Sequence, residues 1–365
     1  MGTKLGLVGL PNAGKSTLFN ALTAGHAAVA PYPFTTIDQN IGIAQVADAR
    51  LDRLARCLTP DRVIPTSIEF VDIAGLVKGA HLGEGLGNQF LSHIFGVDAL
   101  LHVVRCFEDE NVAHPMGGVD PLRDIEIINT ELLLKDLDVV GRRKEKEQKL
   151  AKGGDKHAIK LVEHLEQWGA ALSAGTPIRA LNVSIDAHPK TFGIDLLTAK
   201  PVVYAANLGE TAIAASSPFL APLHALAKHE GADLVTFCAK LEAELIELEP
   251  ADRFAMMQEL GLKESALPQV IRHGYAALRL ITFFTTASKI LQAWTVPSEA
   301  TAPKAAGAIH SDFERHFIRA EVIQTEALLR CGSEANARAQ GLLRLEGKEY
   351  VVQDGDVIHF RVGQG

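Results

Sequence analysis

Residues 9–16 read Gly9-Leu-Pro-Asn-Ala-Gly14-Lys15-Ser16 and match the pattern GxxxxGK[ST] at every constrained position. An apolar segment, Lys4–Val8, precedes this stretch, and a helical pattern follows it and stops near Gly25. A strand, a glycine-containing loop and a helix in this order are the context in which the pattern holds phosphate. We therefore expect a nucleoside triphosphate to bind near the start of the sequence.

Each constrained position of this loop has a role in phosphate binding. The glycines let successive backbone N–H groups turn inward around phosphate oxygens, and the following helix adds its positive dipole end. Lys15 supplies a mobile charge for the β- and γ-phosphates and is expected to stabilise charge during catalysis. The expected phosphate-binding residues are Asn12, Ala13, Gly14, Lys15, Ser16 and Thr17.

A Mg²⁺ site is expected beside the phosphates. The hydroxyl of Ser16 can ligate Mg²⁺, and Asp72, which follows an apolar segment, can reach the ion through a water. In Asp72-Ile-Ala-Gly75, the glycine N–H would face the γ-phosphate. Thr36, favoured over Thr35, would ligate Mg²⁺ only while a γ-phosphate is bound. The predicted metal ligands are thus Ser16, Thr36 and Asp72.

Base selection depends on Asn207-Leu-Gly-Glu210, which follows another apolar segment. Guanine-specific sites use Asn-Lys-x-Asp, whose aspartate accepts hydrogen bonds from guanine. Here the lysine is missing and the acid is one methylene longer, so its carboxylate oxygens are poorly placed to accept hydrogen bonds from guanine. Adenine, with a donor at N6, fits Asn207 and the backbone near Leu208. Cys238-Ala-Lys240 stands where a Ser-Ala-Lys loop usually supports the base, so the expected base-site residues are Asn207, Leu208, Glu210 and Cys238.

The residue that orients the attacking water is not at its usual position. Many GTP-hydrolysing switches place a glutamine directly after Asp-x-x-Gly, but this sequence has Leu76, which cannot hydrogen-bond. Two histidines are candidates instead: His81 in the glycine-rich segment Lys78–Gly87, and His114 in the polar segment Asp109–Pro115. The pattern of residues leaves both open.

Apolar segments separated by helical patterns predict a parallel sheet covered on both faces. Residues 136–175 interrupt this order with two helices around a turn at residues 153–155, and residues 142–160 carry eight basic and three acidic residues, a net charge of +5. Beyond residue 280 we expect a small α+β module with a hairpin, a helix over Ala302–Phe317 and two strands around Asp354-Gly355. The strands expected before this module are Lys4–Val8, Ser67–Val71, Ala99–Val104, Pro201–Ala205 and Asp233–Phe237.

Composition excludes several classes of protein. The 365 residues have a net charge of −8, so the chain is not a wholly basic nucleic-acid binder. No apolar run reaches the roughly 18 residues of a membrane helix, so we expect no membrane partner. The four cysteines form no CxxC pair, which favours a reducing cytoplasm over a disulfide framework or a zinc site; they are Cys57, Cys106, Cys238 and Cys331.

Taken together, these segments resemble the Obg-like ATPases, the YchF branch of the Obg-related translation-factor NTPases. The shared stretches run nearly end to end and include GLPNAGKSTLFNALT, DIAGLVKGAHLGEGLGNQFL, NLGE and DGDVIHF. The resemblance implies an α/β fold in three parts. These are a P-loop, Ras-like G domain with a mostly parallel sheet (residues 1–135 and 176–279), an inserted helical coiled-coil arm (136–175) and a C-terminal β-grasp TGS domain (280–365).

The same resemblance implies a function. It implies a Mg²⁺-dependent ATPase that prefers ATP to GTP, with a hydrophobic residue (Leu76) in place of the catalytic glutamine. The family's proposed catalytic histidine falls on His114, which moves ahead of His81. The expected partners are ATP and the ribosome, at its large subunit, with RNA contacted through the basic arm and the TGS domain. The expected role is a nucleotide switch in translation or stress regulation.

Two other functions stay open at this point. The chain could be a GTPase with relaxed base specificity, since Asn207–Glu210 departs from the guanine pattern only in part. It could also be a nucleotide-gated adaptor for RNA or the ribosome, in which hydrolysis is incidental and the basic arm carries the function.

Overall fold

The computed structural model describes residues 3–24, 40–73, 93–181, 183–212 and 217–363. The chain forms two compact units: unit 1 comprises Met1–Ala44 and Glu69–Ala277, and unit 2 comprises Gln45–Ile68 and Leu278–Gly365. The sequence-based division assigned residues 45–68 to the G domain, whereas the structure groups them with the C-terminal segment. The physical reason is that this stretch supplies a strand and an amphipathic helix that complete the sheet and core of unit 2.

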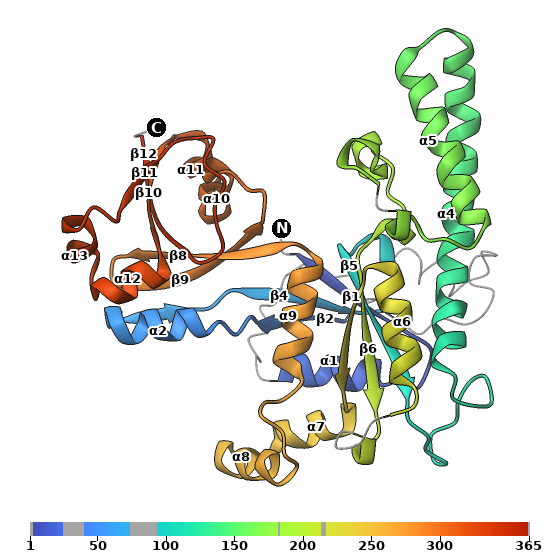
Figure 1. Cartoon of the computed structure of the whole chain (residues 1–365), viewed down its shortest axis with the longest axis horizontal. Coiled ribbons are helices and arrows are strands. Elements are labelled where there is room, and N and C mark those ends of the chain that lie inside the picture. The colour runs from blue at the N-terminus through green and yellow to red at the C-terminus, as the bar shows by residue number, and fades with distance from the viewer. Residues whose placement is uncertain (1–2, 25–39, 74–92, 182, 213–216, 364–365) are drawn as a thin grey trace. The chain divides into compact units, whose positions relative to one another are not determined.

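The sheet of unit 1 has the strand order β2-β4-β1-β5-β6-β7 (Figure 1). β1 is parallel to β4 and to β5, β5 is parallel to β6, and β6 is parallel to β7. The predicted mostly parallel sheet is therefore confirmed, and the complete burial of β5 and β6 explains their continuous apolar sequence. The strands are β1 (Lys4–Val8), β2 (Asn40–Gln45), β4 (Ser67–Asp72), β5 (Ala99–Cys106), β6 (Val202–Leu208) and β7 (Asp233–Phe237).

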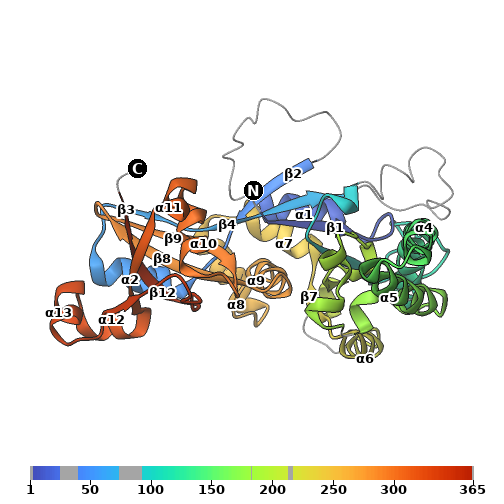
Figure 2. The ribbon, with the colours of Figure 1, turned by 90° about the horizontal axis from the view of Figure 1, so that it is seen from above.

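Helices cover both faces of this sheet (Figure 2). On one face, Val104 and Tyr204 pack into a common core with residues of α4 and α6. On the other face, α9 approaches β1 so closely that a Cβ added at Gly274 would lie 2.7 Å from Leu5 Cδ2. The helices of unit 1 are α1 (Lys15–Ala24), α4 (Pro121–Lys152), α5 (Lys156–Ser173), α6 (Leu220–Glu230), α7 (Ala239–Glu247), α8 (Pro250–Glu259) and α9 (Leu267–Ala277).

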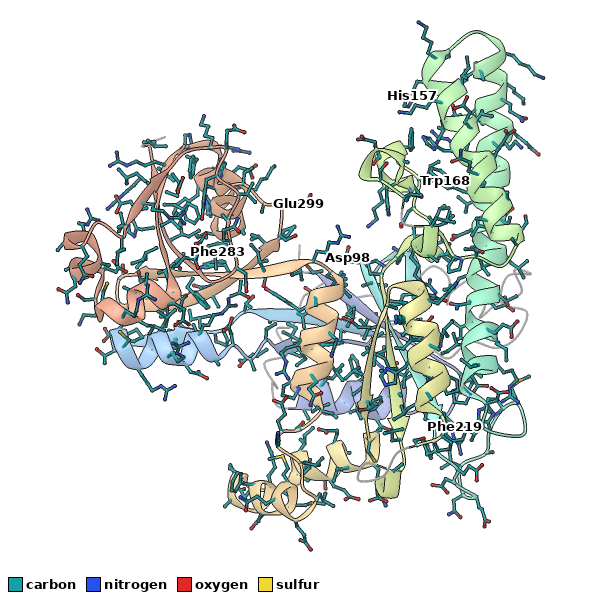
Figure 3. The ribbon with its side chains drawn as sticks, viewed as in Figure 1. Asp98, His157, Trp168, Phe219, Phe283 and Glu299 are labelled. Atoms are coloured by element: carbon teal, nitrogen blue, oxygen red, sulfur yellow. The ribbon has the colours of Figure 1, made fainter. Side chains whose placement is uncertain are left out.

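α4 and α5 form the antiparallel hairpin that the sequence predicts, and Trp168 lies on α5 within it (Figures 1 and 3). Asp155 begins α5, because its carboxylate accepts hydrogen bonds from the N–H groups of residues 157 and 158 at 2.8 and 3.0 Å. The expected apolar seam is buried at Leu161, Leu165 and Trp168. α4 begins 15 residues earlier than expected, at Pro121, because the carboxylate of Asp120 caps its first turn.

Asp136 fixes the middle of α4 to the rest of unit 1. Its side chain is fully buried, and its oxygens accept hydrogen bonds from Leu197 N and Thr198 N, each at 2.8 Å, and from Thr198 Oγ1 at 2.7 Å. Burial raises the pKa of Asp136 to about 6, although these hydrogen bonds act in the opposite direction.

Unit 2 contains a mixed sheet of order β11-β10-β12-β8-β9-β3. Its β8–β9 hairpin is confirmed, and β12 is parallel to β8, as a β-grasp fold requires. Phe283 of β8 lies in the core (Figure 3), and Leu51 and Leu54 of α2 are also buried. The elements are α2 (Ala49–Leu58), β3 (Arg62–Ile64), β8 (Leu280–Ala287), β9 (Ile290–Pro297), α10 (Ala302–Ile309), α11 (Ser311–Arg315), β10 (Phe317–Gln324), α12 (Thr325–Cys331), α13 (Glu334–Ala339), β11 (Arg344–Glu346) and β12 (Asp356–Val362).

Two details of unit 2 differ from expectation. The predicted helix over residues 302–317 is two helices, and Phe317 begins strand β10. Around Asp354-Gly355 one strand forms, β12, because the Asp356 carboxylate accepts a hydrogen bond from Gln353 N at 2.9 Å and holds the preceding residues in a turn. Among the helices that the structure describes, none has the length and apolar character needed to cross a bilayer.

The Asp136→Asn variant should change how stability depends on pH. The folded-state pKa of Asp136 is raised, so the folded protein favours the protonated carboxyl more than the unfolded chain does. This difference contributes roughly 3 kcal/mol to the free energy of unfolding below about pH 4, and the contribution is lost as the pH rises through about 6. The variant cannot titrate, so the unfolding free energy of the wild type minus that of the variant should fall between pH 4 and pH 7 in urea titrations. A difference that stays constant between pH 4 and pH 7 would contradict this assignment.

Candidate nucleotide site

The loop after β1 has the backbone geometry that phosphate binding needs. Asn12 and Gly14 have φ values of +62° and +97°. A Cβ added at Gly14 would lie 2.3 Å from Asn207 Nδ2, and one added at Gly9 would lie 2.4 Å from the carbonyl oxygen of Val103. Both glycines are therefore required for close packing of the loop against β5 and β6.

Lys15 places a buried charge at this loop. Its side chain is 7% exposed, and Nζ donates to the carbonyl oxygen of Leu10 at 2.9 Å. Burial lowers the pKa of Lys15 to about 8, while the nearby Asp72 carboxylate acts in the opposite direction. An anionic phosphate placed here would restore the stability of the charged ammonium.

Ser16 and Asp72, two of the predicted metal ligands, lie together. Ser16 Oγ donates to Asp72 Oδ2 at 3.0 Å, although the residues are 56 positions apart in the chain. A hydroxyl and a carboxylate fit Mg²⁺, which prefers oxygen ligands and is usually held by one or two carboxylates together with substrate phosphates. The third predicted ligand, Thr36, lies outside the described residues, as do Gly75, Leu76 and the alternative histidine His81.

Asn207 joins the phosphate loop to the predicted base loop. Its Nδ2 donates to the carbonyl oxygen of Ala13 at 2.9 Å, and its Oδ1 accepts from Ala239 N at 2.9 Å. Each end of this buried side chain makes one hydrogen bond within the protein, so Asn207 joins the two loops. A carboxamide has a second N–H and a second lone pair, so these two bonds leave Asn207 able to contact a base as predicted.

Glu210 forms an ion pair with Lys240, whose Nζ lies 2.7 Å from Glu210 Oε2. In a guanine site this acid would accept hydrogen bonds from the base. Here the carboxylate faces a lysine in the first turn of α7, the helix that follows Cys238. Cys238 and Leu208 are both buried, and burial raises the pKa of the Cys238 thiol, which therefore stays protonated.

His114 lies in a segment that contacts the phosphate loop. Asn12 Nδ2 donates to the carbonyl oxygen of Ala113, the residue before His114, at 3.0 Å. His114 Nε2 lies 2.9 Å from Asp124 Oδ2, and Met116 N donates to Nδ1 at 3.1 Å. The structure therefore brings the His114 segment to the P-loop, while both ring nitrogens bond within the protein.

The sequence interpretation missed two residues of this region, Asp124 and Arg105, and the pairing of a third, Lys240. Lys240 pairs with Glu210, Asp124 holds His114, and Arg105 is 3% exposed with its Nε donating to the carbonyl oxygen of Phe107 at 3.1 Å. Asp124 could have been found from the sequence, because it is an acidic residue four positions after Asp120, the residue that caps α4. Arg105 had no such signal, because its charge is buried at the end of an apolar strand.

Nucleotide affinity should fall at high pH because of Lys15. The free protein has a Lys15 pKa of about 8, and bound phosphate raises it, so affinity for a nucleoside triphosphate should weaken by up to about tenfold per pH unit above 8. Titration of a fluorescent triphosphate analogue at pH 7.5 and 9.5 measures this. The control Lys15→Arg stays charged and should bind less tightly but with little pH dependence. Unchanged wild-type affinity at pH 9.5 would contradict the assignment.

Comparison with known proteins identifies the family. Residues 4–149 match a family model described as "50S ribosome-binding GTPase", and residues 280–363 match the YchF-GTPase_C model, described as "Protein of unknown function (DUF933)". Proteins named ribosome-binding ATPase YchF from Escherichia coli O157:H7 and Pasteurella multocida are 49% and 48% identical over 360 and 361 residues, 99% of each chain. The solved structure of the Schizosaccharomyces pombe YchF GTPase matches with a TM-score of 0.87 and 35% identity, over 98% of this chain and 97% of that one. With a P-loop site in a parallel sheet and similarity over its full length, the chain belongs to the YchF family of P-loop nucleotide hydrolases.

Proposed function

We propose that the protein is a Mg²⁺-dependent ATP hydrolase that works as a ribosome-associated switch in the cytoplasm. The observation that carries the hydrolase assignment is the P-loop with buried Lys15 beside the Ser16–Asp72 pair. The bacterial relatives named ribosome-binding ATPases support the link to the ribosome.

ATP is the proposed substrate because of the ion pair between Glu210 and Lys240. Guanine recognition needs a carboxylate that accepts two hydrogen bonds, and Lys240 Nζ lies 2.7 Å from one of the two oxygens, Oε2, so it competes with a base for that oxygen. The missing lysine of the guanine pattern, replaced by Leu208, supports the same choice. The bacterial relatives are named ATPases, whereas the S. pombe relative is named a GTPase. A GTPase with relaxed base specificity is therefore the second candidate.

The proposed reaction is attack of water on the γ-phosphorus. The new P–O bond forms as the bond to the β–γ bridging oxygen breaks, and ADP, inorganic phosphate and a proton are released. Lys15 and the N–H groups of residues 12–17 bind the phosphates before the reaction and stabilise the charge that develops. Ser16 and Asp72 would hold Mg²⁺, which neutralises charge on the β- and γ-phosphate oxygens when bound.

We assign the orientation of the attacking water to His114. The support is its place in a segment that contacts the P-loop through Asn12 and Ala113, and the hydrophobic Leu76 where a glutamine would usually stand. To take this role, His114 must release one of its two ring-nitrogen contacts.

The arm formed by α4 and α5 is the proposed contact with ribosomal RNA, at the large subunit. Part of its positive charge is neutralised locally, because Arg142, Arg143 and Lys144 pair with Asp138, Glu147 and Glu166 at 2.9, 2.9 and 3.0 Å. Other basic residues of the arm are exposed and make no ion pair with any described residue; these are Lys146, Lys149, Lys152, Lys156 and Lys160. They are free to contact phosphates.

ATP should compete better than GTP for the site. In displacement of a labelled ATP analogue, we expect at least tenfold tighter binding of ATP, equivalent to about 1.4 kcal/mol. Lys240→Ala, which frees the Glu210 carboxylate, should reduce this preference. A tenfold preference of the wild type for GTP would reject the ATP assignment and favour the second candidate.

His114→Ala should lower the single-turnover rate of ATP hydrolysis by at least tenfold, with ATP affinity within about twofold of wild type, because the imidazole acts on water and not on bound nucleotide. Rapid-quench measurement with enzyme in excess separates the chemical step from binding. His224→Ala, a variant of an exposed histidine on α6, is the control. An unchanged rate would remove His114 from the mechanism.

Charge reversal on the arm should weaken ribosome binding. Replacing Lys146, Lys149 and Lys152 by glutamate should lower affinity by at least tenfold and flatten its dependence on salt, because fewer counterions are released. Co-sedimentation with ribosomes at 50 and 200 mM salt measures both effects. The control reverses three exposed lysines outside both the arm and residues 280–365, with the same change in net charge; these are Lys190, Lys228 and Lys263. Equal losses in the two triple variants would contradict an arm contact.

A further inference from the structure

Asp124, in the first turn of α4, is a buried carboxylate bound to His114. The side chains of Asp124 and His114 are each 6% exposed, and Asp124 Oδ2 lies 2.9 Å from His114 Nε2. The other carboxylate oxygen, Oδ1, accepts from Arg123 Nη2 at 3.0 Å and from Arg123 Nε at 3.3 Å. Both oxygens of Asp124 are therefore used, and the carboxylate is fixed in one orientation.

These contacts determine which nitrogen of His114 carries the proton. Met116 N–H donates to Nδ1 at 3.1 Å, so Nδ1 must present a lone pair. The proton of the neutral imidazole then lies on Nε2, where it is donated to the Asp124 carboxylate. A buried carboxylate that accepts from one ring nitrogen fixes both the tautomer and the orientation of the ring.

The two contacts of His114 differ in how easily they can be broken. The Nδ1 contact is local, to a backbone N–H two residues along the chain, and Met116 is itself exposed. The Nε2 contact is to a buried carboxylate held by the arginine beside it, and Arg123 also donates to the carbonyl oxygen of Gly118 at 2.6 Å. A small displacement of residues 115–117 would free Nδ1 and leave the Nε2 contact in place.

We propose that Asp124 is a positioning residue for hydrolysis: it holds His114 in the Nε2–H tautomer and directs the Nδ1 lone pair to accept a hydrogen bond from the attacking water. This inference rests on the proposed role of His114 and adds that the Asp124 carboxylate orients the imidazole for that role. The contact between Asn12 and Ala113 keeps the histidine beside the phosphate loop while Asp124 fixes its ring.

The test compares Asp124→Asn with the wild type in the full-length protein. The asparagine keeps the size of the side chain but can donate as well as accept, so it no longer selects one tautomer. We expect the single-turnover rate of ATP hydrolysis to fall at least tenfold, with ATP affinity within about twofold of wild type. Asp138→Asn, a half-buried residue farther along the same helix that pairs with Arg142, should retain the wild-type rate.

A double-mutant cycle separates positioning from a general structural role. If Asp124 acts through His114, Asp124→Asn should cause little further loss in the His114→Ala background. A further loss of similar size in that background, or a fall in ATP affinity that matches the fall in rate, would show that Asp124 supports the fold instead. A single-variant rate that equals or exceeds the wild-type rate would also overturn the proposal.

A spectroscopic readout is independent of activity. With a non-hydrolysable ATP analogue bound, when Nδ1 is expected to have left Met116 for the water, the ¹⁵N chemical shifts of the His114 ring nitrogens should report the Nε2–H tautomer in the wild type and a mixture of tautomers in Asp124→Asn. If His114→Ala hydrolyses ATP at the wild-type rate, the proposed role of His114 fails, yet these spectra still decide whether Asp124 sets the tautomer. An unchanged tautomer in Asp124→Asn would overturn the inference whatever the rates.

Discussion

The nucleotide site depends on the contact between Gly14 and Asn207. Gly14 has a positive φ and no Cβ, and the space that a Cβ would occupy is taken by the amide nitrogen of Asn207. The same amide binds the phosphate loop through Ala13 and the start of α7 through Ala239. Three segments that lie far apart in the chain, with Ala13 and Asn207 separated by 194 positions and Asn207 and Ala239 by 32, are thereby held together. They lie at the carboxyl ends of parallel strands, where ligands bind in open α/β sheets.

A second constraint follows from the length of α4. Its 32 residues correspond to roughly 48 Å, and its first turn carries Asp124 while its far end carries basic residues of the arm, among them Lys149 and Lys152. Asp136 fixes the middle of the helix through three hydrogen bonds to Leu197 and Thr198. One rigid element thus connects the side chain that holds His114 with the surface proposed to contact the ribosome.

Much of the fold could be predicted from the sequence, because local patterns reflect local physics. The five predicted strands of unit 1, the helical hairpin with its buried Trp168 and the β8–β9 hairpin are all present. The sequence-based predictions were wrong where pairing with a distant segment, rather than the local residue pattern, determined the structure. The short segment β3 is too small to be recognised alone and becomes a strand because β9 pairs with it. Residues 45–68 belong to unit 2 for the same reason.

For the site, the sequence by itself determined the chemistry of the phosphate loop. The glycines, Lys15 and Ser16 lie within eight residues, so their backbone geometry is local. Only the tertiary structure decided the use of the distant polar groups. It showed that Asn207 joins two loops, that Lys240 occupies the carboxylate of Glu210, and that Asp124 holds His114. These contacts join residues brought together by packing of the sheet and its helices, and hydrogen bonds across such separations leave no periodic or spaced signal in the chain.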